Sequence, residues 1–256
     1  MTTSNVKTAL SVNLNKIALL RNSRDGNYPS VVHHAQVCID AGADGITVHP
    51  RPDQRHIRPQ DARDLSALLK QHPALEFNIE GNPFAGPADN GYPGFVELVT
   101  ELCPHQATLV PDSDDQLTSD HGFDLRISGE SLKPIIQALK ERGIRVSLFM
   151  DPDVEQIALA KEVGADRIEL YTGPYAAAWG SDQLEDIYQL HHAAAQYAAD
   201  IGLGLNAGHD LNLDNLGKYA TIPSLLEVSI GHALTVDSLA MGMSNAVAAY
   251  REVLQQ

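Results

Sequence analysis

Short apolar runs alternate along the chain with longer stretches in which apolar residues recur every three or four positions. The short runs are rich in β-branched residues and too short for helices, which is typical of buried strands. We predict strands over residues 10–14, 44–49, 75–80, 107–110, 146–150, 167–171, 203–206 and 225–230. The longer stretches predict helices over residues 31–41, 59–71, 95–103, 132–141, 154–163, 183–201, 213–219 and 236–254.

The order of these elements indicates the fold class. Strands that alternate with helices form right-handed βαβ units on a parallel sheet. Eight such units in a chain of 256 residues predict an α/β fold, a single (β/α)8 TIM barrel. We place the barrel at residues 8–256, after a flexible N-terminal segment at residues 1–7. The alternative, a doubly wound open sheet, needs a glycine-rich phosphate turn after the first strand, where residues 13–16 contain no glycine.

Charge and composition exclude several classes of protein. The chain carries 33 acidic and 18 basic residues, a formal net charge of −15, which argues against a nucleic-acid-binding protein and against binding to an anionic membrane surface. No apolar run is long enough to span a bilayer and residues 1–7 do not resemble a signal peptide, so we expect a cytoplasmic protein. Cys38 and Cys103 have neither disulfide nor metal-site spacing, and we expect both to be buried free thiols.

Polar side chains fall at the ends of nearly all the predicted strands. In (β/α)8 barrels the active site is built at the carboxyl ends of the strands. The polar residues at these ends are Asn13, Asn15, His49, Arg51, Asn78, Glu80, Asp112, Asp151, Glu169, Tyr171, Asn206, His209 and His232. Side chains alternate between the two faces of a strand, and carboxylates inside a barrel are costly unless they are paired or catalytic. We therefore predict an active site at this end of the barrel.

Basic side chains cluster after the second predicted strand, where the chain carries His49, Arg51, Arg55 and His56. In an acidic protein such a cluster suits a phosphorylated substrate, which needs a focused cationic pocket. A structural interpretation stays open beside this one. In it the two arginines are solvated surface charges and His49 is a core histidine with satisfied hydrogen bonds.

Two glycine turns, at residues 206–209 and 229–232, follow the seventh and eighth predicted strands. Barrels frequently bind phosphate there through backbone N–H groups, and glycine lets the backbone approach an anion closely. We interpret both turns as phosphate sites because each carries a histidine; the alternative is that Gly208 and Gly231 only turn the chain. The histidines and carboxylates have no metal-site spacing, and we expect no metal.

A resemblance to a known family rests on segments that follow one another in the family's order: residues 11–24, 42–57, 78–80, 108–111, 146–149, 168–173, 206–209 and 230–232. These segments resemble the pyridoxine 5′-phosphate synthases over nearly the whole chain. The resemblance implies a (β/α)8 barrel that condenses 1-deoxy-D-xylulose 5-phosphate with 3-amino-2-oxopropyl phosphate to pyridoxine 5′-phosphate, with release of phosphate and water. It also implies that no metal or organic cofactor takes part and that the chain forms a homo-octamer built from dimers.

The resemblance further implies roles for individual residues. His49 and Glu80 match the family's general bases, His209 matches its general acid, and Glu169 matches a carboxylate that stabilises charged intermediates. The residues that match positions around the aminoketone phosphate are Asn13, Arg24, Gly231 and His232. The residues that match positions around the deoxyxylulose phosphate are Arg51, His56 and Thr118. Thr118 lies in a polar loop at 112–124 that we expect to act as a lid.

The chain departs from the family's pattern at three places. Asn15 and Lys16 stand where Asp-His is common, Asp210 stands where glycine is common, and the loop at 81–94 is longer than expected. We assign Asn15, Lys16 and Asp210 to substrate binding, the last through its backbone N–H. A carboxylate beside a phosphate is unfavourable unless it points away.

Two other functions stay open. A phosphosugar aldolase or isomerase would favour a Schiff-base lysine at a strand end, where this chain offers only Lys16. A non-catalytic barrel that binds a phosphorylated metabolite would bind its ligand without turnover. The presence of His49, Glu80 and His209 together argues against this second alternative.

Overall fold

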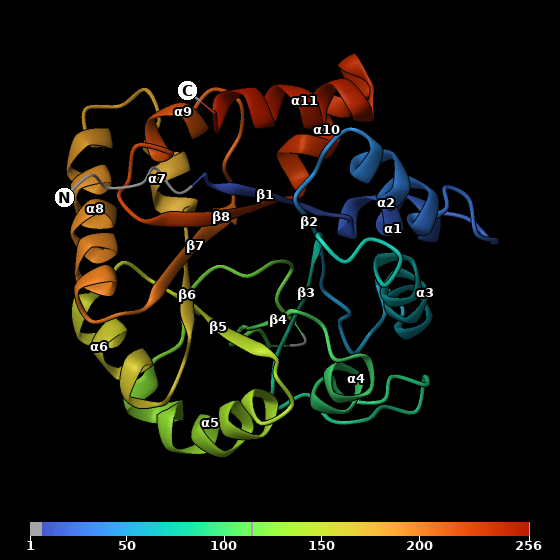
Figure 1. Cartoon of the computed structure of the whole chain (residues 1–256), viewed down its shortest axis with the longest axis horizontal. Coiled ribbons are helices and arrows are strands. Elements are labelled where there is room, and N and C mark those ends of the chain that lie inside the picture. The colour runs from blue at the N-terminus through green and yellow to red at the C-terminus, as the bar shows by residue number, and fades with distance from the viewer. Residues whose placement is uncertain (1–6, 114, 256) are drawn as a thin grey trace.

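The computed structural model describes residues 7–113 and 115–255. Its strands form one closed parallel barrel in sequence order, with β8 paired to β1 (Figure 1). The strands are β1 (Ala9–Asn13), β2 (Gly45–Val48), β3 (Glu76–Gly81), β4 (Gln106–Leu109), β5 (Arg145–Met150), β6 (Arg167–Leu170), β7 (Gly204–His209) and β8 (Leu225–Ile230). This confirms the predicted (β/α)8 barrel and excludes the open sheet. The segment at 1–7 lies outside the described residues, apart from Lys7.

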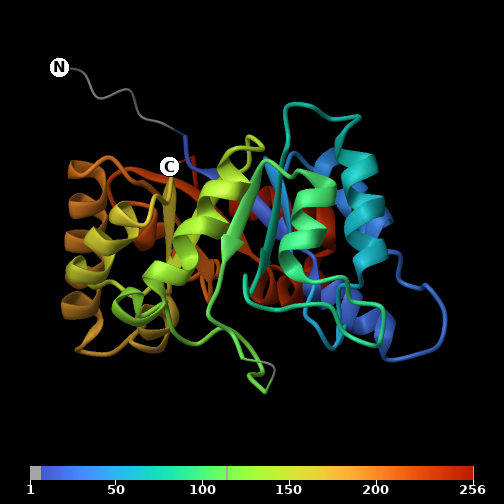
Figure 2. The same cartoon turned by 90° about the horizontal axis from the view of Figure 1, so that it is seen from below.

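Helices form the outer layer around the strands (Figures 1 and 2). They are α1 (Asn15–Asn22), α2 (Val31–Asp40), α3 (Pro59–Leu69), α4 (Phe95–Leu102), α5 (Leu125–Lys140), α6 (Val154–Glu162), α7 (Gly173–Ala177), α8 (Leu184–Asp200), α9 (Leu216–Tyr219), α10 (His232–Met241) and α11 (Met243–Val253). In the part of the chain that the structure describes, none of these helices has the length and apolar character needed to cross a membrane.

The main core lies between the barrel and the helical layer. Leu10, Ile46, Ile79, Val146 and Ile168 are fully buried on the outward faces of their strands. Each such side chain contributes about 1.5–3 kcal/mol by removing apolar surface from water. Because neighbouring side chains on a strand point to opposite faces, the residues that alternate with them point into the barrel.

The barrel interior is polar, and its groups bond to one another. Thr108 Oγ1 donates to Asn78 Oδ1 at 3.1 Å, halfway along the strands. Nearer the amino-terminal ends, Arg167 Nη1 donates to Asn206 Oδ1 at 3.0 Å and lies 3.3 Å from Glu227 Oε2. Buried polar groups are tolerated when they are hydrogen-bonded in this way. The polar groups at the carboxyl ends of the strands therefore lie above further polar, hydrogen-bonded groups inside the barrel.

Some element boundaries differ from the prediction. The apolar spacing misses α1, because Leu19 and Leu20 on this helix are exposed. The predicted closing helix at 236–254 is two helices, α10 and α11, which Gly242 separates with a φ of +83°. Glycine adopts this left-handed conformation without strain. Cys38 is buried as expected, whereas Cys103 is exposed at the end of α4, so the expectation is wrong for Cys103.

Candidate active site

The four predicted acid–base groups lie at the same end of the barrel. His49 directly follows β2, Glu80 lies near the end of β3, Glu169 lies near the end of β6, and His209 is the last residue of β7. His49 and Glu169 are buried, and Glu80 and His209 are partly exposed. The charge of Glu80 acts on Glu169, and that of His209 acts on His49. The four groups therefore surround one mouth, as the strand ends predict.

Asparagine side chains connect two of these groups. Asn13 Nδ2 donates to Glu80 Oε2 at 3.3 Å, and Asn13 Oδ1 accepts from the backbone N–H of Asn15 at 3.0 Å. Asn15 Oδ1 in turn accepts from the backbone N–H of His49 at 2.9 Å. Asn15 thus fixes the backbone at His49, and its amide oxygen is already occupied.

The two carboxyl groups of the mouth hold their protons unusually tightly. Burial, reinforced by the carboxylates of Asp112 and Glu227, raises the pKa of Glu80 to about 8, and the Arg51 guanidinium only partly opposes this. Burial together with the negative charges of Glu80 and Glu227 raises the pKa of Glu169 well above its ordinary value. Near neutral pH this pair can hold and release protons, which is the property that acid–base catalysis requires.

The buried histidines of the mouth stay neutral. Burial and the positive charge of Arg51 lower the pKa of His49 well below its ordinary value. Burial and the same guanidinium lower the pKa of His56 to about 3, with a smaller effect from Lys16. His56 Nδ1 accepts from the backbone N–H of Ile57 at 2.9 Å, so Nε2 carries the proton of this neutral ring. A neutral imidazole at His49 is able to accept a proton from a substrate.

A buried ion pair joins Arg51 to the loop that follows β4. Arg51 pairs with Asp112, and Ser119 Oγ donates to Asp112 Oδ2 at 2.7 Å. Arg51 Nη1 also donates to the carbonyl of Gln116 at 3.3 Å, and Arg55 Nη1 donates to the same carbonyl at 2.8 Å. The basic cluster after β2 therefore binds the loop at 112–124, which projects beyond the strand ends (Figure 2).

The strand ends pointed to Asp112, but the sequence gave it no role and no partner. Its position after the fourth strand gave a signal, but its partner Arg51 lies far away in the sequence. Within the described ranges, Asp112 Oδ1 is buried and has no hydrogen-bond partner. Arg51 and Arg55 are thus bonded to groups of the protein and are not free surface charges.

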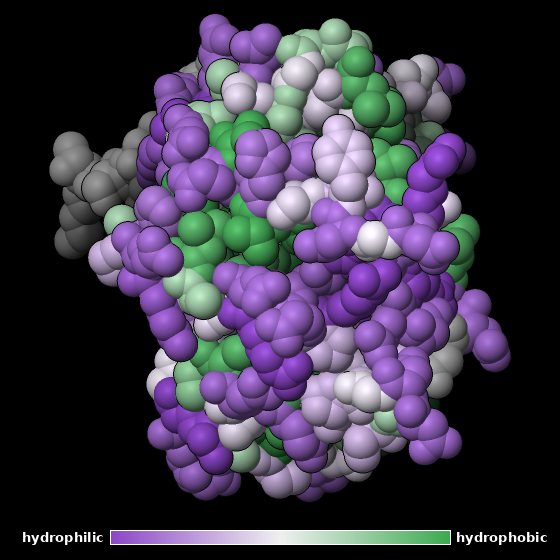
Figure 3. Space-filling model, turned by 90° about the vertical axis from the view of Figure 1, so that its right-hand side faces the viewer, coloured by the Kyte–Doolittle hydropathy of each residue, from purple (hydrophilic) through white to green (hydrophobic). Residues whose placement is uncertain are grey.

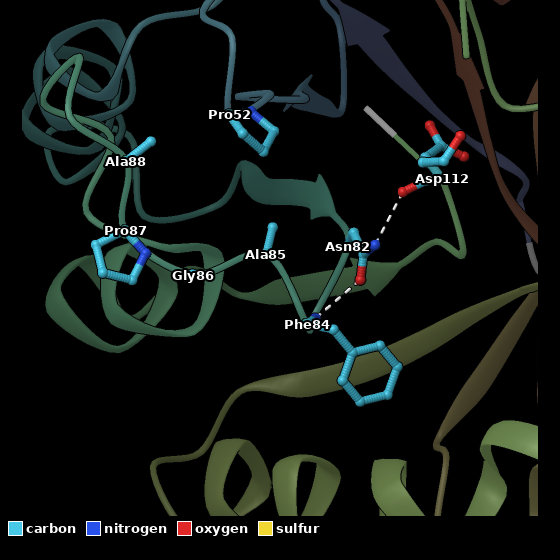
Figure 4. A pocket seen from close by; sticks show the side chains of 9 residues that line it. Pro52, Asn82, Phe84, Ala85, Gly86, Pro87, Ala88 and Asp112 are labelled. Carbon is cyan, nitrogen blue, oxygen red and sulfur yellow. Dashed lines mark hydrogen bonds between the residues drawn. The ribbon is translucent and has the colours of Figure 1, made fainter. Parts of the chain in front are cut away.

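A cleft of about 430 Å³ lies beside this ion pair, between the loops that follow β2, β3 and β4 (Figure 4). Its lining residues are Pro52, Asn82, Phe84, Ala85, Gly86, Pro87, Ala88, Asp112 and Ser113. Asn82 holds the two sides together, because Nδ2 donates to the Asp112 carbonyl and Oδ1 accepts from the Phe84 N–H, both at 2.8 Å. The long loop at 81–94 therefore shapes the rim of the mouth.

The loop also reaches His209. Thr118 Oγ1 lies 2.8 Å from His209 Nε2, and Asp210 Oδ2 lies 2.7 Å from His209 Nδ1. The rings of Phe149 and Tyr171 flank the imidazole at centroid distances of 6.4 and 5.9 Å. The strand ends pointed to Tyr171, whereas nothing in the sequence linked Phe149 to His209.

The glycine turns have local structural reasons for glycine. A Cβ on Gly208 would lie 2.1 Å from the Ser229 carbonyl oxygen, so the spacing of β7 and β8 requires glycine there. A Cβ on Gly231 would lie 3.0 Å from Asn13 Cβ. Gly231 precedes α10, so unpaired backbone N–H groups of that helix point toward this side of the mouth. His232, the first residue of α10, is exposed.

Arg24 is the predicted site residue that the structure leaves apart. It is exposed in the turn after α1, and within the described ranges no contact joins its side chain to the mouth. The remaining predicted binding residues lie on the loops and helix starts described above. Their roles toward a substrate stay predictions.

The chain is similar to known proteins over almost its whole length. Residues 10–256 match the family model described as pyridoxal phosphate biosynthesis protein PdxJ. The chain is 56% identical to a pyridoxine 5′-phosphate synthase of Xanthomonas axonopodis pv. citri, with 97% of each chain covered. It is 53% identical to that of Xylella fastidiosa, with 97% of this chain and 95% of the relative covered.

Solved structures with little sequence similarity share the barrel. A ligand-free tryptophan synthase from M. tuberculosis aligns with a TM-score of 0.62 at 13% identity, with 99% of this chain and 95% of that chain covered. Phosphoribosyl anthranilate isomerase from Thermotoga maritima aligns with a TM-score of 0.58 at 12% identity, with 97% and 98% covered. At such identities the likeness concerns the fold alone.

Proposed function

The chain belongs to the pyridoxine 5′-phosphate synthase family, an enzyme family of vitamin B6 biosynthesis, and we propose how its mouth carries out the reaction. The proposed substrates are 1-deoxy-D-xylulose 5-phosphate and 3-amino-2-oxopropyl phosphate. An amine attacks a ketone, water and phosphate leave, and a pyridine ring closes. Each of these steps moves a proton, so the mouth has to supply donors and acceptors near neutral pH.

The observation that carries the proposed function is that a neutral imidazole, His49, and a protonated carboxyl group, Glu80, lie at the same mouth of the barrel. His49, kept neutral by burial and by Arg51, accepts a proton as a general base. Glu80, whose pKa is raised to about 8, starts with a proton and becomes a base once it has given that proton away. Glu169 beside it gains a negative charge when a cationic amine or iminium lies near, and then stabilises that cation.

The two phosphates have separate proposed sites. Arg51, His56 and Thr118 would hold the phosphate of deoxyxylulose phosphate, in support of which Arg51 is buried on the rim beside the lid loop. Asn13, Gly231 and His232 would hold the aminoketone phosphate at the start of α10. Arg24, which lies apart from the mouth in this structure, stays a predicted residue of the same site. We therefore expect Arg51 to rearrange on binding, because a phosphate competes with Asp112 for its guanidinium.

Asn15, Lys16 and Asp210, where the chain departs from the family's pattern, also have proposed roles. Asn15 holds the backbone of His49, and Lys16 adds positive charge near His56. The backbone N–H of Asp210 donates to Thr172 Oγ1 at 3.4 Å. We keep all three as substrate-binding residues, with Asn15 acting through His49.

We also propose that the chain assembles into a homo-octamer built from dimers. Apolar side chains are exposed on α1 and on α10, which contacts it: Leu19, Leu20, Val236 and Leu239. The side of the barrel seen in Figure 3 carries groups of apolar residues within a largely hydrophilic surface. Exposed apolar groups of this kind mark protein–protein contacts. Sedimentation of the purified chain, and of a Leu20→Glu/Leu239→Glu variant, tests this: the wild type should be octameric and the variant smaller.

We propose a cytoplasmic location, where free cysteines such as Cys38 stay reduced. A fluorescent-protein fusion followed by cell fractionation tests the location. An extracytoplasmic signal would contradict it.

The purified chain, mixed with both substrates in the presence of a metal chelator, should form pyridoxine 5′-phosphate and inorganic phosphate. Product is measured by its absorbance after chromatography, and phosphate by a colorimetric assay. The reaction should need neither a metal nor an organic cofactor. As a control, a mixture that lacks either one of the two substrates should give no product. Tight binding of the substrates without turnover would instead favour a non-catalytic barrel and overturn the proposal.

A further inference from the structure

Both ring nitrogens of His209 have a partner in the mouth. Nδ1 lies 2.7 Å from Asp210 Oδ2, and Nε2 lies 2.8 Å from Thr118 Oγ1. An ionised carboxylate only accepts hydrogen bonds, so Nδ1 carries a hydrogen and donates it to Asp210. The bond therefore selects the tautomer and turns Nε2 toward the lid, where a substrate would enter.

The backbone on either side of the pair is held in place. Thr172 is buried, and its hydroxyl donates to the carbonyl of Gly208 at 2.7 Å while lying 3.4 Å from the N–H of Asp210. Asn215 Nδ2 donates to the carbonyl of Asp210 at 3.4 Å. His209 itself has a φ of +38°, a left-handed conformation that a non-glycine residue adopts only at a cost. The fold thus holds both side chains of the pair at the end of β7.

We propose that Asp210 is a positioning residue for His209, which it holds in one orientation and stabilises in the protonated form. The proposal rests on the proposed function, in which His209 is the general acid. When Nε2–H gives its proton to a departing oxygen, the ring becomes neutral and keeps Nδ1–H on the carboxylate. Asp210 remains ionised throughout, as carboxylates do in other carboxylate–histidine pairs.

The pairing also explains how a carboxylate is tolerated in a mouth that binds phosphates. Hydrogen bonding from His209, more than the nearby charge of His232, lowers the pKa of Asp210. The carboxylate of Asp210 thus accepts a hydrogen bond from His209 instead of facing an anion.

The other groups around the ring are of mixed charge. His49 lies at the end of β2, near enough for the two imidazoles to interact, and the Tyr171 ring after β6 and the Thr118 hydroxyl of the lid lie against His209. Asp120 and Asp151 act on Tyr171 and lie farther out. Of these groups, Asp210 is the charged one bonded directly to the imidazole.

Kinetics of Asp210→Asn and Asp210→Gly test the proposal, with Asp214→Asn as the matched control from the same loop. We expect kcat to fall about tenfold to a hundredfold in both Asp210 variants, with both KM values little changed, because the loss affects one proton transfer. The alkaline limb of the kcat profile should move to lower pH by about one pH unit, since the carboxylate is partly exposed. The control should match the wild type. A raised KM with an unmoved pH profile would overturn the proposal.

A double-mutant cycle separates positioning from a direct role. In a His209→Asn background, Asp210→Asn should cause no further loss, because its effect passes through the missing imidazole. Additive losses would overturn the proposal.

A measurement without substrates keeps this inference distinct from the proposed function. Diethyl pyrocarbonate modifies only unprotonated imidazoles, and peptide mass spectrometry reports the modification of His209 at each pH. In the full-length wild type, the half-point should lie about one pH unit above that of Asp210→Asn. Equal half-points would overturn the positioning role even if the enzyme makes its product. A displaced half-point in a protein that makes no product would support the pair and refute only the proposed function.

Discussion

Replacing Glu80 by glutamine tests the electrostatics of the mouth and its chemistry together. The folded chain holds the Glu80 proton up to a pKa of about 8, whereas the unfolded chain releases it near the ordinary value of 4.5. Between these two pH values unfolding releases a proton, so the free energy of unfolding of the wild type falls as pH rises through this window. Glutamine does not titrate, so the variant should lack this part of the pH dependence.

The pKa values set the size of the effect. The interval from 4.5 to about 8 corresponds to an upper limit of about 5 kcal/mol, at about 1.4 kcal/mol per tenfold change in proton affinity. Glu80 is partly exposed and its charge acts on Glu169, so we expect about 1–3 kcal/mol. Relative to the wild type, Glu80→Gln should therefore be more stable at pH 9 than at pH 5 by this amount.

Urea unfolding of the ligand-free protein at pH 5 and pH 9 measures the difference, with the exposed Glu162→Gln as a control that should follow the wild type. In the same preparation, kcat of Glu80→Gln should fall about a hundredfold, the contribution of one acid–base group. An equal stability difference at both pH values would show that Glu80 is ionised in the empty mouth. In that case the reasoning from burial is wrong, whatever the rate.

Three further predictions concern other parts of the molecule. Arg51→Met should lower the free energy of unfolding by about 3–5 kcal/mol in urea unfolding, because it leaves the buried carboxylate of Asp112 unpaired. The double variant Asp112→Asn/Arg51→Met should recover part of that loss. No recovery would contradict the pairing. Gly231→Ala should raise KM for the aminoketone phosphate severalfold with KM for deoxyxylulose phosphate unchanged, since its Cβ would press on Asn13 at 3.0 Å; steady-state kinetics with each substrate varied in turn decides this. Burial lowers the pKa of His191 to about 4, so the wild type should lose stability as pH falls from about 6.5 toward 4. In thermal unfolding, His191→Leu should lose less stability over this pH range than the wild type. An equal loss in both proteins would show that His191 is not its cause.

The alternation of strands and helices was enough to predict the barrel. Runs such as 46–48 are apolar on their outward faces and too short for helices, and this pattern depends only on local sequence and solvent. The prediction failed at α1, where exposed Leu19 and Leu20 disturb the apolar spacing, and at Gly242, which divides the last helix.

The sequence by itself placed His49, Glu80, Glu169 and His209 at strand ends, because the carboxyl ends of parallel strands in a closed barrel necessarily meet at one mouth. It was silent on which side chains bond there. Only the tertiary structure brings Asp112 to Arg51 and Thr118 to His209, since each pair joins separate loops of the chain. The tertiary structure also decides the proton affinities, because the burial that keeps Glu80 protonated arises only when all eight strands have closed around it.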